Sequence, residues 1–141
     1  MKKIAVLGTG NIAQTVAVDL KSNGHEVRLF APDYLISRIQ KIVDTHEIEC
    51  VGVFEAKEKI DVVTSDIDKA VKGADYIILC VPGNRHEEYA RILKGHTTAQ
   101  QILITFNGCM VSLIYKNVWE EDASCPIFAE STIPPFSARR V

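Results

Sequence analysis

The chain has 141 residues, of which 47% are hydrophobic, and a formal net charge of −2 at pH 7. This length suits one domain with a substantial core and is too short for two ordinary domains. No basic stripe points to nucleic acid, no apolar run approaches the roughly 20 residues of a membrane span, and Lys2 and Lys3 precede too few apolar residues for a secretory signal. We therefore expect a cytoplasmic protein with neither nucleic acid nor a membrane as partner.

Cysteines and histidines give no metal-binding pattern. The four cysteines are widely spaced and contain no CxxC pair, which is typical of buried thiols in a reducing compartment. The histidines at positions 25, 46 and 96 also lack the spacing of ligands, so we expect no metal site. The cysteines are Cys50, Cys80, Cys109 and Cys125.

The first third of the chain alternates apolar runs with helical patterns. Residues 3–7 form a continuous apolar run, as expected for a strand buried on both faces. Apolar residues then recur four apart from Asn11, and Gly24 stands where a helix commonly ends. Residues 26–30 predict a second strand, and the spacing of apolar residues over 35–43 predicts a second helix.

The middle of the chain is less regular. Residues 49–54 and 60–64 predict two short strands, which we expect to form a hairpin around the charged sequence EAKEK. Ser65 or Asp66 then caps a short helix. Residues 76–81 are the most apolar run and predict a central strand.

The last third continues the alternation. We expect a helix through 89–93, a strand over 102–106, a helix over 111–118 and a last short strand over 126–129. Alternating strands and helices require crossover connections, which give a parallel sheet with helices on both faces. The sequence thus predicts a single doubly wound α/β domain of Rossmann type over 1–141, with its ligand at the carboxyl ends of the strands.

The stretch GTGNIA follows the first predicted strand and opens the first predicted helix. In this context Gly8 permits a sharp turn, Gly10 lets a pyrophosphate approach the backbone, and Ala13 lets helix and strand pack closely. The helix N-terminus offers free N–H groups to the phosphates. The alternative is a glycine-rich turn without a ligand. The predicted cofactor-binding residues of this corner are Gly8, Thr9, Gly10, Asn11, Ile12 and Ala13.

The end of the second strand normally separates NAD from NADP binding. An acidic residue there binds the ribose hydroxyls, whereas a basic one favours the 2′-phosphate. Here Ala31 occupies the usual acidic position and Asp33 comes two residues later, while Arg28 and Arg38 are the nearest basic candidates. We predict NAD or NADP as the cofactor, with Ala31 beside it, and leave the preference open.

Three segments together carry a family resemblance. GTGNIA, VTSDIDKAVKGADYIILCVPGNRHEEYA and AESTIPPFSAR resemble the nucleotide-binding half of the octopine/opine dehydrogenases, which belong with the glycerol-3-phosphate and 6-phosphogluconate dehydrogenases. The resemblance implies NAD(P)H-dependent condensation of an amino acid with a 2-keto acid through an imine. It further implies that Val81, Pro82 and Gly83 line the cofactor and that Glu130 lies on the nicotinamide side. His86, which follows this loop, is expected to be a polar residue at a helix start that touches the cofactor.

The resemblance has limits. This chain has Ala138 where the family often has Cys before an Arg, here Arg139. The family carries its substrate site and catalytic residues in a second, helical domain, which we expect to be missing here, so we assign no catalytic residue and expect no turnover by this chain alone. We expect either that missing C-terminal domain or a homodimer formed through residues 111–119 as partner. The alternative is a stand-alone dinucleotide sensor, but the sequences around Ala31 and VTSD lack the acidic motifs of such modules.

Overall fold

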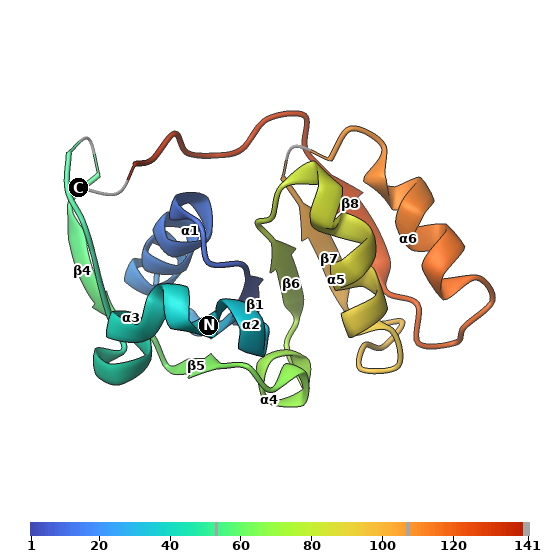
Figure 1. Ribbon diagram of the computed structural model, residues 1–141, viewed down its shortest axis with the longest axis horizontal. Helices are drawn as coiled ribbons and strands as arrows, with labels where there is room; N and C mark the ends of the chain where they lie inside the picture. The colour runs from blue at the N-terminus through green and yellow to red at the C-terminus, as the bar shows by residue number, and fades with distance from the viewer. Residues whose placement is uncertain (53, 107, 140–141) are drawn as a thin grey trace.

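The computed structural model describes residues 1–52, 54–106 and 108–139, and they form a six-stranded parallel sheet with helices on both faces (Figure 1). The strand order is β5-β2-β1-β6-β7-β8. The strands are β1 (Lys3–Leu7), β2 (Glu26–Phe30), β5 (Val62–Thr64), β6 (Tyr76–Leu79), β7 (Ile102–Thr105) and β8 (Ile127–Glu130). The helices are α1 (Asn11–Ser22), α2 (Asp33–Ile36), α3 (Gln40–Thr45), α4 (Ile67–Val71), α5 (His86–Leu93) and α6 (Val111–Trp119), with 3₁₀ turns η1 (Ser37–Ile39) and η2 (Gly83–Arg85).

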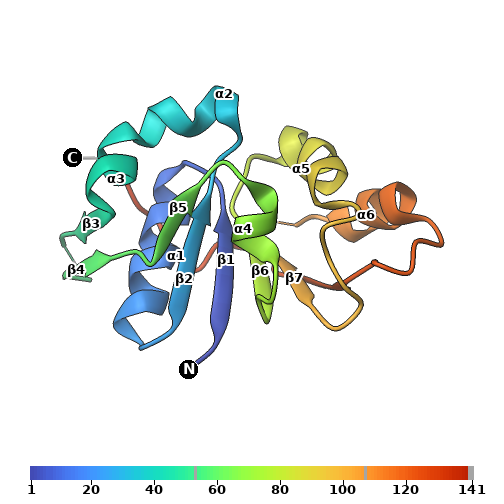
Figure 2. The same cartoon turned by 90° about the horizontal axis from the view of Figure 1, so that it is seen from below.

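This strand order confirms the predicted Rossmann-type fold. The chain builds outward from β1 to β2 and β5, then crosses back to place β6 on the other side of β1. The order reverses between β1 and β6, and in such sheets the dinucleotide binds at the carboxyl ends of the strands at this switch point. Figure 2 shows the strands side by side, with the loops after β1, β2 and β6 at the same edge.

The two faces of β1 explain the two-sided core. Ile4 and Val6 pack with α1 on one face, whereas Ala5 and Leu7 pack with α4, α5 and α6 on the other. Because both faces are covered, the strand is continuously apolar rather than alternating. Trp119, the only tryptophan in the chain, is fully buried in the core that contains Ala5 and Leu7. Its ring packs edge-on against Tyr115 and Phe128, with centroids 6.4 and 5.7 Å away.

The prediction that residues 49–54 and 60–64 pair as a hairpin is wrong. Strand β3 (Glu47–Cys50) pairs antiparallel with β4 (Ala56–Lys59), so the charged EAKEK sequence supplies a strand rather than the turn. Opposite charges face each other across this pair, and Lys57 Nζ lies 3.0 Å from Glu47 Oε2. Strand β5 instead joins β2 in the large sheet. Residue 53 of the predicted first strand lies outside the described residues.

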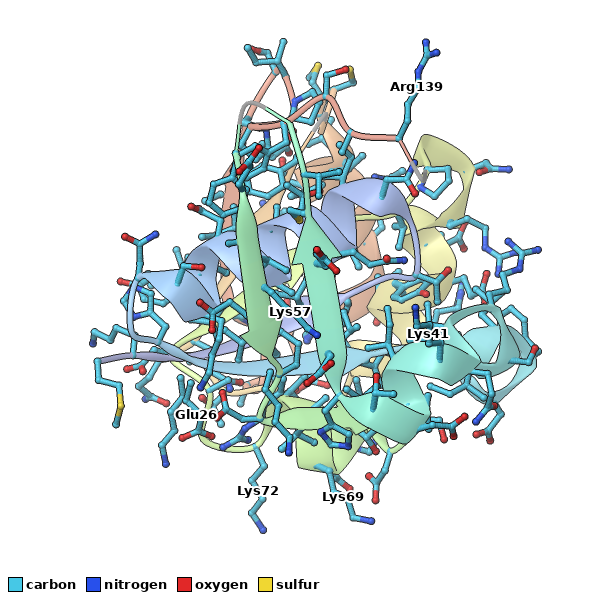
Figure 3. All side chains as sticks on the ribbon, turned by 90° about the vertical axis from the view of Figure 1, so that its left-hand side faces the viewer. Glu26, Lys41, Lys57, Lys69, Lys72 and Arg139 are labelled. Atoms are coloured by element: carbon cyan, nitrogen blue, oxygen red, sulfur yellow. The ribbon has the colours of Figure 1, made fainter. Side chains whose placement is uncertain are left out.

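The hairpin of β3 and β4 covers α1 on the outside of the sheet, as Figure 3 shows around the labelled Lys57. The helix expected over 35–43 is divided into α2, η1 and α3. The buried Ile39 leaves the helical region (φ −120°, ψ 27°) and separates η1 from α3. The predicted cap of α4 is confirmed at Asp66, whose carboxylate accepts hydrogen bonds from the N–H groups of Asp68 and Lys69.

Candidate dinucleotide site

The turn after β1 requires glycine at its first position. Gly8 has φ +138°, and a Cβ there would lie 2.4 Å from the carbonyl oxygen of Cys80, at the end of β6. Its N–H donates to the carbonyl of Phe30 at the end of β2, at 3.0 Å. Gly8 therefore holds the ends of β1, β2 and β6 together, because any side chain would push the loop after β6 away.

At position 10, in contrast, neither the backbone conformation nor the surrounding atoms require glycine. Its backbone is extended (φ −77°, ψ 172°) and any residue type could adopt it, while a Cβ there would meet no atom within 4 Å. It is the N-cap of α1, and no side chain among the described residues caps that end. The N–H groups of the first turn thus stay available to a phosphate that approaches over Gly10. Ala13 is fully buried and packs the helix against β1.

Three polar side chains at this corner donate hydrogen bonds to backbone carbonyl groups. Gln14 donates to the carbonyl of Thr9 at 2.9 Å, and Thr15 donates to the carbonyl of Asn11 at the same distance. The Asn11 amide donates to the carbonyl of Ala138 at 3.2 Å. Ile12 is half-buried beside them, against the α1 side of the core.

The segment after β8 runs along the carboxyl edge of the sheet to α1 and the β3–β4 hairpin (Figure 1). Its Phe136 ring stacks on Phe54, with centroids 6.2 Å apart. At its end Arg139 is exposed, and its side chain extends away from the ribbon in Figure 3. The segment therefore returns the chain from β8 to the glycine corner, where Ala138 contacts Asn11.

At the end of β2, Ala31 is fully buried and its N–H donates to the carbonyl of Thr64, at 3.1 Å. Asp33 is exposed at the start of α2. Arg28 is occupied, because its guanidinium donates to Glu26 at 2.6 Å and to the carbonyl of Lys72 at 2.8 Å. Arg28 is thus not free to bind a 2′-phosphate.

The loop after β6 faces the glycine corner. Val81 is half-buried, while Pro82 and Gly83 are exposed, and a Cβ on Gly83 would meet no atom within 4 Å. The loop turns into η2 through a hydrogen bond from the Arg85 N–H to the carbonyl of Pro82, at 2.9 Å. Together with Gly8 and Gly10 this loop forms one small-residue rim at the switch point.

His86 lies in a different environment from the one expected. It is the first residue of α5, at a helix start as expected, but only 1% of its surface is exposed. Its Nδ1 lies 2.6 Å from the Tyr115 hydroxyl, which in turn lies 2.9 Å from the Thr105 hydroxyl. Burial lowers the pKa of His86, against an opposing effect of the Glu130 charge. The predicted position of His86 at the start of a helix is confirmed, whereas the burial of its ring in a hydrogen-bonded chain was not predicted.

Glu130 ends β8 and caps α6. Its carboxylate accepts hydrogen bonds from the N–H groups of Met110 and Ser112, at 2.9 and 2.6 Å. Desolvation raises its pKa, but hydrogen bonds from Ser112 and from the first turn of α6 outweigh this and leave the pKa lowered. The loop that presents these donors contains two residues in left-handed conformations, Cys109 (φ 47°) and Met110 (φ 68°).

A cluster that the sequence analysis missed joins the loops after β2 and β6. The Tyr34 hydroxyl bonds to both Arg85 and Glu88, and Arg85 Nε lies 2.9 Å from Glu88 Oε2. The Arg85 guanidinium carbon lies 5.3 Å from the centroid of the Tyr34 ring. Beside them the Tyr89 hydroxyl is buried and has no hydrogen-bond partner among the described residues. Tyr34 and Arg85 are 51 residues apart, and no local pattern predicts their meeting.

Among the residues that the structure describes, no group of three His, Cys, Asp or Glu side chains gathers as a metal site would require. Within the same ranges no helix is long and apolar enough to cross a bilayer. What the carboxyl edge does hold is a glycine-lined corner, an uncapped twelve-residue helix and an open rim at the switch point. These features define a dinucleotide-binding domain of Rossmann type.

The comparisons place the chain in a family. Residues 3–115 match the model of the N-terminal region of NAD-dependent glycerol-3-phosphate dehydrogenases, and the chain belongs to this family. The prediction of NAD or NADP as cofactor is thereby confirmed.

The resemblance to opine dehydrogenases is confirmed as well. Vitopine synthase of Allorhizobium ampelinum is 28% identical over the whole of this chain and 40% of its own length. An opine dehydrogenase of Arthrobacter is 35% identical over 76% of this chain and 30% of its own length. A structure of octopine dehydrogenase in complex with NADH and agmatine superposes on 91% of this chain and 34% of its own with a TM-score of 0.77, at 23% identity. The chain thus spans about 40% of the length of the first of these relatives.

Proposed function

We propose that this chain is the cofactor-binding part of an opine dehydrogenase-like oxidoreductase, which reduces an imine formed from an amino acid and a 2-keto acid. The observation that carries the proposal is the corner after β1. Gly10 is open to solvent on the side where a Cβ would project, and it precedes an uncapped helix at the switch point of the sheet.

The residues of the corner fit the diphosphate of a dinucleotide. Backbone N–H groups from Gly10 to Ile12 would donate to the phosphate oxygens, and the positive end of the α1 dipole would favour their charge. Thr9 and Asn11 would flank the diphosphate, with Ala13 holding the helix close to β1. The bound cofactor supplies the hydride. The task of this chain is to bind and orient the nicotinamide.

The remaining predicted contacts follow from the strand ends. Ala31 follows β2 and would lie on the adenosine side, and Val81, Pro82 and Gly83 would form the rim between the two halves of the cofactor. On the nicotinamide side, Glu130 acts by capping α6 and so fixing the loop after β7. His86 would act indirectly, because its hydrogen bond with Tyr115 stabilises the start of α5.

The substrate site belongs to another part of the protein. The chain covers 40% of vitopine synthase and 30% of the Arthrobacter opine dehydrogenase, so we place the substrate-binding and proton-donating groups in a second domain. The described residues carry an apolar stripe on α6, formed by Met110, Leu113 and Ile114, which is 36% or more exposed at each position. A second domain or a second copy of this chain would cover it.

Ligand-dependent thermal unfolding tests the proposal. A dinucleotide at a hundredfold excess over its dissociation constant should stabilise the chain by roughly 2.7 kcal/mol, so melts are recorded with NAD, NADH, NADP and NADPH. Gly10→Val should unfold like the unliganded wild type and lose the shift, because the added methyls occupy the phosphate path and nothing else. Four unshifted melts of the wild type would contradict the proposal.

Turnover gives a second test. Reduction of an imine needs a proton donor and anchors for the substrate carboxylates, and the described residues beyond β8 contain a single basic side chain, Arg139. The chain alone should therefore not oxidise NADH or NADPH in the presence of pyruvate and a panel of amino acids. A steady rate that Glu130→Ala abolishes would place the catalytic group in this domain instead.

A further inference from the structure

Three buried side chains form a hydrogen-bonded link between the elements around β6 and β7. His86 Nδ1 lies 2.6 Å from the Tyr115 hydroxyl, which lies 2.9 Å from the Thr105 hydroxyl. At most 1% of each residue is exposed. His86 begins α5, Thr105 ends β7 and Tyr115 stands on α6, and Figure 1 shows α5 and α6 side by side near β7. One hydroxyl group therefore joins three elements, and we call these three side chains the Tyr115 link.

The loops at this edge are joined to one another in two ways. The loops after β7 and β8 are joined through their backbones, because the Ser131 N–H donates to the Thr105 carbonyl at 3.0 Å and the Gly108 N–H donates to the Ser131 carbonyl at 2.9 Å. The loop after β6 leads into α5, and among the residues that the structure describes, the hydrogen bonds between the start of α5 and the end of β7 pass through Tyr115. The polar connection between the loops after β6 and β7 thus rests on one side-chain atom.

Aromatic neighbours hold the Tyr115 ring in place. The ring centroid lies 5.9 Å from that of His86, 6.4 Å from that of Trp119 and 5.4 Å from that of Phe128. Burial lowers the pKa of His86 and raises the pKa of Tyr115, while the Glu130 charge raises both by a smaller amount. Both side chains are therefore uncharged at pH 7, and the Tyr115 link is a neutral connection that needs no counter-ion.

A dinucleotide bound at the glycine corner would extend toward this link. With the diphosphate at the start of α1 and the adenosine at the end of β2, the nicotinamide would lie on the other side of the switch point, over the ends of β6 and β7. The loop of Pro82 and Gly83 and the loop after β7 would then flank the ring. A displacement of about 1 Å in groups that position a reacting ring, even when caused far from it, can lower the rate about a hundredfold.

We propose that Tyr115 and Thr105 are positioning residues for the nicotinamide half of the cofactor. The inference rests on the proposed function. Because both side chains are buried, neither touches the cofactor, and they act through the two loops whose spacing they hold. The adenosine half lies across the switch point, beside β1 and β2, and does not depend on this spacing. Loss of the link should therefore weaken binding of the nicotinamide and spare binding of the adenosine.

Calorimetric titration of the 141-residue chain tests the assignment with two ligands that differ by the nicotinamide. These are NADH and ADP-ribose, or NADPH and 2′-phospho-ADP-ribose where the thermal melts select NADP. Tyr115→Phe should weaken the dinucleotide by roughly two- to thirtyfold and leave the affinity for the ADP-ribose ligand unchanged. Thr105→Val should do the same, because it removes the second hydroxyl at nearly equal volume. Thr105→Ser keeps that hydroxyl and should bind both ligands like the wild type.

Gln101→Leu is the matched control, because it breaks a buried hydrogen-bonded connection just before the other end of β7. Gln101 is 5% exposed, and its amide donates to the carbonyls of Val71 and Ala74 at 2.7 and 2.9 Å. Its loss should lower the midpoint of urea unfolding, as Tyr115→Phe does, but should leave both affinities unchanged. A merely structural role of Tyr115 predicts instead that the two variants behave alike in binding as well as in unfolding.

The two ligands separate failure of this inference from failure of the proposed function. Equal weakening of both ligands by Tyr115→Phe would overturn the inference, as would unchanged affinities or a loss by Thr105→Ser as large as that by Thr105→Val. Equal affinity of the wild type for the two ligands would also overturn it, because this chain would then not hold the nicotinamide. Where Tyr115→Phe does not fold, the two Thr105 variants decide. Absence of wild-type binding to either ligand would instead contradict the proposed function.

Discussion

The two halves of the sheet form their parts of the carboxyl edge in different ways. In the half formed by β5, β2 and β1, the corner is made of backbone and the smallest side chains, and Gly8 sets its shape. In the half formed by β6, β7 and β8, hydrogen bonds between distant side chains set the shape, as in the chain of His86, Tyr115 and Thr105. Damage to the first half should therefore act through steric overlap, and damage to the second through unpaired polar groups.

The largest expected effect is in the first half. Gly8→Ala places a methyl group 2.4 Å from the Cys80 carbonyl and forces alanine to φ +138°. Overpacking and a backbone region that L-residues avoid each cost on the order of 1–3 kcal/mol, so we expect a loss of about 3 kcal/mol in the free energy of unfolding, measured by urea titration. Gly10→Ala is the matched control, since its methyl meets nothing within 4 Å. Equal stability of the two variants would show that the loop after β6 yields freely.

The second half is tested by removing one oxygen atom. Tyr115→Phe leaves both the His86 ring and the Thr105 hydroxyl without a partner in the core. Each unpaired buried group costs about 1–3 kcal/mol, and we expect a loss near 2 kcal/mol in chemical denaturation. Tyr89→Phe makes the same change at a hydroxyl that no residue in the described part of the chain pairs, so stability should be unchanged or slightly higher. A loss as large as that of Tyr115→Phe would mean that the Tyr89 hydroxyl is bonded in solution.

The cap of α6 gives a smaller, pH-dependent effect. The folded pKa of Glu130 lies below the ordinary glutamate value of 4.5, so its contribution is complete above that value and is lost as the pH falls through 4.5 toward the folded pKa. Glu130→Gln should cost about 1 kcal/mol at pH 7, the usual worth of an N-cap, because the side chain is exposed to solvent. The difference in unfolding free energy between Glu130→Gln and wild type should shrink on acidification to pH 3. A constant difference would assign the cost to packing.

The smallest effect on stability is expected on the apolar stripe of α6. Leu113 is 55% exposed between Met110 and Ile114, so Leu113→Lys should change the free energy of unfolding by less than about 0.5 kcal/mol. If the stripe joins two copies of the chain, the wild type sediments as a dimer and the variant as a monomer. Identical sedimentation of both proteins at high concentration would remove the stripe from any self-association. Lys116→Leu makes the reverse change one turn after Leu113 and should not weaken self-association.

The same contrast explains what the sequence predicted. The bounds of β1 and β2 and the tight turn at Gly8 were predicted correctly because buried parallel strands and tight turns leave local patterns. The position of β4 was missed because the alternating charges of residues 56–59 resemble a solvated turn until β3 supplies opposite charges across from them. The burial of His86 depends on Tyr115, 29 residues later. The contact of Tyr34 with Arg85 likewise depends on the sheet, which brings the ends of β2 and β6 together.

The buried position of Trp119 gives the molecule an internal optical reporter. Its indole lies against Tyr115, whose hydroxyl reaches His86 at the start of α5. As the only tryptophan, it emits from one known place in the half of the sheet that side-chain contacts organise. Its emission can therefore show whether a change made at the glycine corner remains local, and energy transfer from it to a bound reduced nicotinamide can follow cofactor binding without any added label.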